Sequence, residues 1–308
     1  MSSVEVRPFQ RGDRQQLTHL VNVHAGAVIP GMSASVNTVL AQLEREPGEP
    51  VVDPWVVERL TLVAEQRRRV VAAAHLLRYA ADDSVGEWYR DSAEIRWFLF
   101  WPAAPFWPDS SEAAETLMSA CVAQLDRWGV SEQGADGALP VPGVYGVPEQ
   151  WPHVRAVYER AGFVHQGRTE IVYVANVAEL RRPKNPPISG LALRRCVGIN
   201  GTRLSATLGE DVVGYIEVES REDAGRLPQH GGWADIGNLH VAEGHRRQGV
   251  GTWLVGQAAE WLQLGRFDRL LDYAWPEQQE YRAFLRKLGF RELTWTQRGW
   301  RRRAAQAI

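Results

Sequence analysis

The spacing of apolar and polar residues predicts a first α/β segment that ends near residue 179. Alternating apolar residues predict strands, and apolar residues three or four apart predict helices. The predicted strands are residues 4–7, 61–65, 70–79, 94–101 and 164–175, and the predicted helices are residues 11–27, 35–46, 111–128 and 151–161. Two of these strands, 61–65 and 70–79, flank a short polar stretch and are expected to form a hairpin.

A second segment repeats this order in shortened form after residues 180–190. That stretch has three prolines and a glycine in a polar context, which disfavours helix and strand and predicts a linker. The predicted strands beyond it are residues 191–196, 202–208, 211–219, 234–241, 269–273 and 290–296, and the predicted helices are residues 249–264 and 278–288. We therefore expect a diverged internal repeat with domains at residues 1–179 and 191–308. The second domain has no counterpart of the first two helices.

Composition is that of an ordinary globular protein, and length suggests two domains. Of the 308 residues, 44% are hydrophobic and 23% are charged. A net charge of −2 gives no reason to expect nucleic acid as a partner. The sequence has neither an apolar run of membrane-span length nor a signal-peptide core, so no membrane partner and a cytoplasmic location are expected. Two cysteines, Cys121 and Cys196, are too few for a disulfide framework or a cysteine-rich metal site, and no metal is expected.

The most informative local pattern is a strand that leads into a basic, glycine-bearing turn at a helix start. After the predicted strand 234–241, Arg246, Gly249 and Gly251 follow in the spacing Arg-x-x-Gly-x-Gly. The first turn of a helix has unpaired backbone N–H groups and the positive end of the helix dipole. Glycines let a phosphate approach the backbone, and arginines add charge. The turn is therefore expected to bind an anionic group.

This motif resembles the acyl-CoA-binding motif of the GNAT N-acetyltransferase superfamily, and Gly289-Phe290 after the last helix resembles that family's closing motif. Both segments are similar to GNAT domains. The resemblance implies an α/β (α+β) fold of two domains, each with a mixed, mostly antiparallel twisted sheet flanked by helices. It also implies that acetyl-CoA is the co-substrate and binds to the C-terminal domain. The cofactor-binding residues implied by the resemblance are Leu239, His240, Val241, Arg246, Arg247, Gln248, Gly249, Val250, Gly251 and Thr252.

The N-terminal domain departs from the motif at residues 100–111. That stretch has no glycine and no arginine, its prolines remove N–H donors, and Asp109 would repel phosphate. We expect this domain to have lost acyl-CoA binding and to have a structural or acceptor-side role. Tyr158 stands at the family's usual acid position, and it is expected to be a packing residue.

The family reaction is direct attack of an amine on a thioester, which requires the amine to lose a proton. Asp235 precedes Val241 by six residues and matches the place of a glutamate base in the histone-acetylating branch of the family. Glu217 and Glu219, on the neighbouring predicted strand, are further candidates for the base, and so is His240.

The leaving thiolate can be protonated by an acid, and the family often uses a tyrosine four residues before the glycine of Gly-Phe. Here that position holds Leu285. Tyr281 lies one helical turn earlier and is the candidate replacement, with Tyr215 and Tyr273 as alternatives. The reaction also proceeds without an acid, because a thiol with a pKa of about 8.5 is a tolerable leaving group.

The sequence thus predicts an acyl-CoA-dependent N-acyltransferase whose acceptor is a small-molecule amine. Transfer to a protein amine is one alternative. A non-catalytic acyl-CoA-binding or sensing protein is another, because Leu285 replaces the usual acid. Without the two missing helices, the acceptor side of the C-terminal domain would be open or covered by the N-terminal domain or a second chain. A homodimer is therefore an option.

Overall fold

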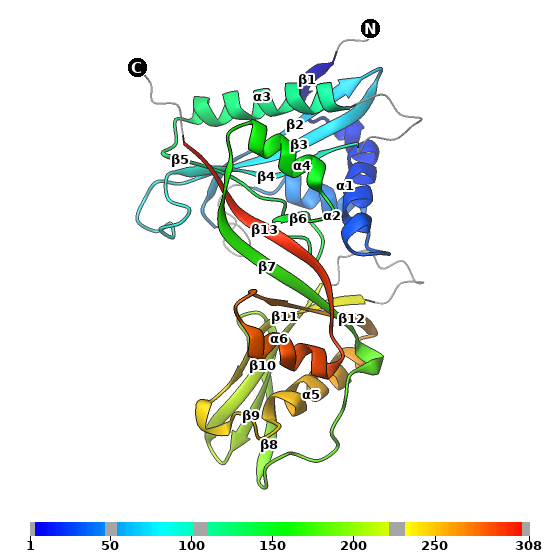
Figure 1. Ribbon diagram of the computed structural model, residues 1–308, viewed down its shortest axis with the longest axis vertical. Helices are drawn as coiled ribbons and strands as arrows, with labels where there is room; N and C mark the ends of the chain where they lie inside the picture. Colours follow the sequence, from blue (N-terminus) through cyan, green and yellow to red (C-terminus); the bar gives the residue numbers. More distant parts are fainter. Residues whose placement is uncertain (1–3, 47–53, 102–109, 222–231, 304–308) are drawn as a thin grey trace. The chain divides into compact units, whose positions relative to one another are not determined.

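The computed structural model describes residues 4–46, 54–101, 110–221 and 232–303. The chain divides into two compact units (Figure 1). Unit 1 comprises Met1–Thr169 and Trp295–Ile308, and unit 2 comprises Glu170–Thr294. Among the described residues, no helix combines the length and apolar character needed to cross a membrane.

Unit 1 contains a mixed sheet with strand order β1-β2-β3-β4-β5-β13, in which β4 and β5 run parallel. Helix α3 packs against β2, β3 and β4. Large side chains such as Trp97, Tyr158 and Trp300 are buried in the core. The elements are β1 (Glu5–Pro8), η1 (Arg11–Asp13), α1 (Arg14–Val28), α2 (Val36–Leu43), β2 (Val56–Gln66), β3 (Arg69–Tyr79), β4 (Ser92–Phe100), α3 (Ser111–Trp128), β5 (Glu132–Ala135), β6 (Val147–Pro148), α4 (Pro152–Arg160) and the first part of β7 (Val164–Asn176).

Unit 2 contains strands in the order β7-β12-β11-β10-β9-β8, with β11 and β12 parallel and the other pairs from β7 to β8 antiparallel. Helices α5 and α6 pack on one face of this sheet, where Leu254 and Leu285 share a core cluster with Ile216. The elements are the last part of β7, η2 (Val177–Glu179), β8 (Leu191–Gly198), β9 (Gly201–Leu208), β10 (Asp211–Arg221), β11 (Gly232–Val241), η3 (Glu243–His245), α5 (Val250–Leu264), β12 (Phe267–Ala274), α6 (Gln279–Leu288) and the first residues of β13 (Arg291–Arg303), whose remainder belongs to unit 1.

The predicted mixed α/β fold is confirmed, but three strands differ from the pattern. The apolar and polar pattern does not indicate β5 and β6, which are short. Strand β13 extends to Arg303, beyond the predicted end at residue 296. Its last residues are mostly polar, and their pairing with β5 decides their conformation. Periodicity cannot reveal such strands, because their partners are distant in the sequence.

The boundary between the compact units lies within β7 and β13, whereas a linker had been expected at residues 180–190. That segment belongs to unit 2, and we call residues 181–187 the strap. A Cβ atom on Gly256 of α5 would lie 2.9 Å from the Arg181 carbonyl oxygen. Arg182 donates hydrogen bonds to Gln263 (2.7 Å) and to the Val177 carbonyl (2.9 Å). The prolines exclude regular structure here, but the close packing fixes the strap along α5.

Candidate functional site

The parallel strands β11 and β12 separate halfway along β11. They pair between Gly232 and Asp235 of β11, where Asp235 lies opposite Leu271. From there β11 continues to Val241, and the pairing described for this second half is with β10 alone. The backbone groups on the β12 side of residues 236–241 therefore form a free edge. Ligands of α/β sheets commonly bind at the carboxyl ends of parallel strands, where such an opening forms.

A β-bulge follows this point of separation. Register partners pass from Ile236 to Asn238, so Gly237 is the extra residue. Its Cβ position would lie 2.4 Å from Cβ of Asn200, which leaves room only for glycine. After the bulge, Asn238 and His240 lie exposed on one face of β11, while Leu239 packs against the core under α5 and α6. The alternation expected for His240 and Leu239 is thus confirmed.

The turn between β11 and α5 has the conformation of an anion cradle. Gly249 is the N-cap with φ of 87°, in the left-handed region, and its Cβ position is 3.1 Å from Pro187. Gly251 lies in the first turn, where a Cβ atom would be 3.3 Å from the Phe284 ring. The N–H groups from Gly249 to Thr252 have no acceptor within the helix. The two glycines of the motif therefore leave these N–H groups accessible to an anion.

The polar side chains of this turn are exposed and weakly held. Arg246 donates a hydrogen bond to the Val241 carbonyl (3.1 Å). Arg247 forms an ion pair with Glu280 (2.9 Å), and both side chains are more than 80% exposed. Gln248 donates to a backbone carbonyl of η3. An ion pair this exposed contributes little stability, so Arg247 can turn toward a bound anion at small cost.

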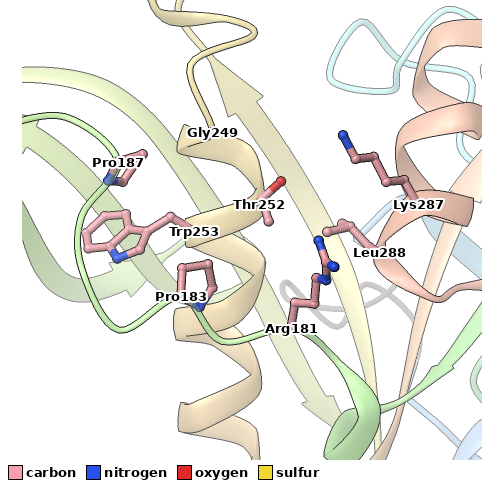
Figure 2. A pocket seen from close by; sticks show the side chains of 8 residues that line it. All are labelled: Arg181, Pro183, Pro187, Gly249, Thr252, Trp253, Lys287 and Leu288. Carbon is pink, nitrogen blue, oxygen red and sulfur yellow. The ribbon is translucent and has the colours of Figure 1, made fainter.

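A cavity of about 250 Å³ opens beside the first turn of α5 (Figure 2). The residues that line it come from the strap, α5, α6 and the N-cap of α5, and they are Arg181, Pro183, Pro187, Gly249, Thr252, Trp253, Lys287 and Leu288. In Figure 2 the Thr252 hydroxyl, the Lys287 ammonium group and the Arg181 guanidinium group point into the same space between α5 and α6. Two cations beside a helix N-terminus create a positive potential that suits a phosphate group.

Two aspartate–tyrosine pairs lie where β11 and β12 separate. Tyr273 donates a hydrogen bond to Asp235 Oδ1 (2.9 Å), and Tyr281 donates one to Asp272 Oδ2 (2.6 Å). Both carboxylates are buried and both tyrosines are half-buried. Two of the predicted catalytic residues, Asp235 and Tyr281, therefore belong to these pairs. Asp235 accepts a hydrogen bond from a tyrosine, and Tyr281 donates one to an aspartate.

Burial raises the pKa of Asp272 to about 7. Loss of hydration is the largest cause, the nearby Asp235 charge adds to it, and the hydrogen bond from Tyr281 opposes it. Burial also raises the pKa of Tyr281 far above its usual range. Near neutral pH, Asp272 is therefore the group in this pair that can gain and lose a proton.

Glu217, another of the candidate bases, is held by protein partners. Its side chain is 1% exposed and forms an ion pair with Arg203 (2.7 Å). It also accepts hydrogen bonds from the Ile199 N–H (3.3 Å) and from Asn200 (3.2 Å). These contacts tie the β8–β9 turn to β10. The side chain of Glu217 thus organises the turn, and its oxygens are occupied.

The residues at the two positions of the family's usual acid are both buried. Leu285 is part of the core of unit 2. Tyr158 in unit 1 is also buried, and its hydroxyl donates to the Asp136 carbonyl (2.7 Å), as expected of a packing residue. Most of the divergent N-terminal stretch, residues 102–109, lies outside the described residues.

Neither cysteine belongs to these pairs. Cys121 is buried in α3 of unit 1, where burial raises its thiol pKa well above the usual range, and Cys196 is exposed on β8. In the part of the chain that the structure describes, no three His, Cys, Asp or Glu side chains are grouped so that they could hold a metal ion.

Sequence reasoning missed Asp272, Arg181 and Lys287. A signal for Asp272 was present, because it stands near the carboxyl end of the predicted strand 269–273, and polar residues at such strand ends often serve function. The two cations gave no such signal. Arg181 lies in a proline-rich stretch that was interpreted as a linker, and only tertiary packing places it near Lys287.

Comparison with known proteins gives one family match and several similar solved structures. Residues 180–290 match the model of the acetyltransferase (GNAT) family, while no curated protein matches the sequence. A tandem GNAT protein from the clavulanic acid biosynthesis pathway, solved without acetyl-CoA, superposes with a TM-score of 0.71 at 14% identity, over 99% of this chain and 100% of that one. A GCN5-related N-acetyltransferase from Sphaerobacter thermophilus gives 0.63 at 11% identity, over 99% and 97%.

A third similar structure is the GCN5-related glucosamine N-acetyltransferase region of a fungal multi-domain GH3 beta-N-acetylglucosaminidase. It gives a TM-score of 0.66 at 11% identity, over 97% of this chain and 38% of that one. At these identities the structural matches establish the fold, and the family match covers the residues that form the cradle and the separating strands. Residues 180–290 thus match the model of the acetyltransferase (GNAT) family, and the chain as a whole has a fold similar to that of a tandem GNAT protein.

Proposed function

We propose that this protein is an N-acyltransferase that uses acetyl-CoA and transfers the acetyl group to a small-molecule amine through unit 2. One observation carries the proposal. The glycine-bearing turn that opens α5 and the free edge of β11 adjoin each other at the same end of the sheet. Such an arrangement offers donors for phosphates and an unpaired backbone edge to one elongated ligand.

The residues present fit acyl-CoA. The N–H groups from Gly249 to Thr252 suit its diphosphate, because Gly249 and Gly251 leave no side chain between the backbone and the anion. Arg181 and Lys287 in the adjoining cavity suit a further phosphate. The free edge at residues 236–241 suits the amides of the pantetheine arm. Acetyl-CoA, when bound, supplies the activated acetyl group.

The face of β11 opposite α5 and α6 suits an amine. Asn238 donates a hydrogen bond to the Tyr215 hydroxyl (3.1 Å), and His240 lies against the Tyr215 ring (5.6 Å between centroids). Asp235 and its cross-strand partner Glu219 share this face. Carboxylates and an aromatic ring attract a cationic amine before it reacts. Asp235 is the base in this proposal, since Glu217 is occupied by its ion pair.

A direct test combines binding and turnover. Acetyl-CoA is titrated into the protein by calorimetry, and release of the CoA thiol is then followed with a panel of small amines. Saturable binding at one site per chain, followed by amine-dependent thiol release, is the expected result. Binding without thiol release for any amine would favour the acyl-CoA sensor, an alternative suggested by the buried Leu285 in place of the usual acid. No binding would contradict both functions.

A further inference from the structure

The face of the unit 2 sheet opposite α5 and α6, called the open face below, has charges of opposite sign on different strands. Asp235 of β11 and Glu219 of β10 are register partners and form its negative part. Arg203 of β9 is the register partner of Glu217, which shares a face with Glu219 because side chains two apart along a strand point the same way. Arg194 of β8 also lies on this face, since its register partner stands two residues after Arg203. The two arginines form the positive part.

The Arg203 side chain is held in place while part of its guanidinium group is left over. Its Nε donates a hydrogen bond to Glu217 (2.7 Å), and its guanidinium carbon lies 4.2 Å from the centroid of the Tyr215 ring. In the described part of the chain, the two terminal nitrogens have no hydrogen-bond partner, and the side chain is 31% exposed. These two nitrogens form a planar fork that matches the two oxygens of a carboxylate.

Polar groups continue from Arg203 toward the point where β11 and β12 separate. The Tyr215 hydroxyl accepts a hydrogen bond from Nδ2 of Asn238 (3.1 Å), so its own hydrogen can be donated to another acceptor. Asn238 is exposed and follows the bulge at Gly237 directly. A ligand that extends from Asp235 to Arg203 therefore crosses a polar surface that offers both donors and acceptors.

We infer that the acceptor is a zwitterion, a primary amine with a carboxylate about six bonds away. Arg203 binds the carboxylate, and the amine lies beside Asp235. The inference rests on the proposed function, because it names the substrate class of the same site. Charges of both signs on one face favour a ligand with both signs over a simple cation, since each end meets a group of opposite charge.

The spacing of the strands sets the length of this acceptor. Strands β9 and β11 are two strand spacings apart, or about 10 Å. A hydrogen-bonded carboxylate oxygen lies about 3 Å from the guanidinium nitrogens, which leaves about 7 Å for the ligand. An extended chain advances about 1.2 Å per bond, so about six bonds separate the nitrogen from the carboxyl carbon. The α-amine of an amino acid is too close to its carboxylate, whereas a terminal amine on a six-carbon acid fits.

The carboxylate takes no part in the transfer itself. The amine nitrogen loses a proton to Asp235 and bonds to the acyl carbon, and the carbon–sulfur bond breaks with its electron pair on sulfur. Asp235 returns its proton to solvent, and the thiolate takes one from solvent, so an amide and a thiol result. Arg203 is therefore expected to affect KM for the amine and to leave kcat nearly unchanged.

The first test needs no turnover. With the protein saturated with CoA, calorimetry compares 6-aminohexanoate with hexylamine, which has the same amine and chain length but no carboxylate. The acid should bind at least about tenfold more tightly, because it gains a charge-assisted pair of hydrogen bonds. Among acids with a terminal amine, 4-aminobutanoate and 8-aminooctanoate should bind more weakly than 6-aminohexanoate.

Variants assign this preference to one side chain. Arg203→Gln removes the fork and should reduce the preference to about twofold or less, while the affinity for hexylamine stays and shows that the site is folded. Arg203→Lys keeps a charge beside Glu217 but has no fork, so it should lose most of the preference without leaving that carboxylate unpaired. Arg195→Gln is the matched control. Arg195 also stacks on an aromatic ring at 4.2 Å, but that ring belongs to Trp261 of α5 on the other face. It should keep the wild-type preference.

Turnover gives a second measurement. With acetyl-CoA and 6-aminohexanoate, Arg203→Gln should raise KM for the amine by about tenfold or more and change kcat by less than about twofold. With hexylamine, the same variant should match the wild type in both constants. A structural defect would instead change the constants for both amines.

The outcomes separate this inference from the proposed function. Equal affinities of the wild type for 6-aminohexanoate and hexylamine, or no binding of either, would overturn the carboxylate site. A preference that persists in Arg203→Gln would overturn it as well. Neither result bears on thiol release from other amines, so the transferase would stand. A preference that Arg203→Gln abolishes, without thiol release from acetyl-CoA, would support the carboxylate site and contradict the transferase.

Discussion

Three acidic residues of unit 2 show how surroundings give one residue type different roles. Glu217 is fixed by Arg203 and by the β8–β9 turn, so it acts in stability. Asp235 accepts a hydrogen bond from the Tyr273 hydroxyl (2.9 Å) and faces the polar side of the sheet. Asp272 is fully enclosed on the helix side, where its pKa rises to about 7. Burial and partners, rather than residue type, decide which of these groups can move a proton.

Substitutions can distinguish the structural role of Glu217 from the proposed catalytic role of Asp235. Glu217→Gln should lower the free energy of unfolding by about 1–3 kcal/mol, because it weakens a buried ion pair, and it should change kcat little. Asp235→Asn should keep acetyl-CoA affinity but lower kcat by about 10²–10⁴-fold, since a base is lost. Urea unfolding and thiol-release assays measure the two effects. A large kcat loss in Glu217→Gln, with stability intact, would reverse the assignment.

The backbone conformation of Gly249 gives a second prediction. Alanine at a left-handed position costs about 1–2 kcal/mol, and Gly249→Ala also places a Cβ atom 3.1 Å from Pro187 at the cradle. Gly209→Ala is the matched control, because φ is 62° there and no atom lies within 4 Å of the added Cβ. Both variants should lose stability in thermal unfolding. Only Gly249→Ala should also weaken acetyl-CoA binding, by about tenfold or more, in calorimetry.

At the scale of elements, α5 organises the site. Its first turn supplies the N–H groups, its apolar side packs on β9 to β12, and Gly256 admits the strap against its surface. The strap in turn brings Arg181 and Pro187 to the cavity beside the cradle. A segment without regular structure thus lines the cavity of the proposed binding site, because packing against α5 fixes its course.

The chain has two lysines, Lys184 and Lys287, and their substitution can test whether the cavity contributes to acetyl-CoA binding. Lys287→Glu reverses a charge that points into it, and acetyl-CoA affinity should fall by about tenfold at low salt. Lys184→Glu makes the same change on the exposed strap but outside the cavity lining, so affinity should change little. The difference between the variants should shrink at high salt, as expected for an ionic contact. Equal losses in both variants would indicate a general charge effect.

At the scale of the whole molecule, the two compact units do not follow the simple order of the chain. Strand β7 begins in unit 1 and ends in unit 2, and β13 does the reverse. Residues Arg269–Ala274 of β12 need Ile171–Asn176 of β7 as their partners, and Trp300 near the C-terminus is buried in unit 1. Each unit therefore depends on residues that the internal repeat assigns to the other half.

Fragments test this division. A fragment of Glu170–Thr294 should unfold cooperatively and bind acetyl-CoA, because it retains the β7–β12 pairing and the strap. A fragment of residues 191–308 should show a lower unfolding midpoint and weaker binding, because it lacks both and leaves Trp300 without its core. Circular dichroism during heating and calorimetry compare them. A higher midpoint for residues 191–308 would contradict the division.

The local part of the site could be predicted from the sequence. Arg246, Gly249 and Gly251 lie at the expected strand-to-helix turn, because this motif depends on backbone conformation and on residues adjacent in the chain. The positions of Asp235 on a strand and of Tyr281 on a helix also agree with the predicted elements. These features depend on periodicity and on turn chemistry, which are local properties.

Only the tertiary structure decided the rest. The tertiary structure places Asp272 within hydrogen-bond distance of Tyr281 and pairs Glu217 with Arg203. It also brings the strap and Lys287 to the same cavity. Each of these pairings joins elements that are separated in sequence, and their energies depend on burial and strand register. Such quantities exist only once the sheet is assembled. The sequence by itself therefore determined the glycine-bearing strand-to-helix turn, and the fold decided the burial and the partners of the carboxylates beside it.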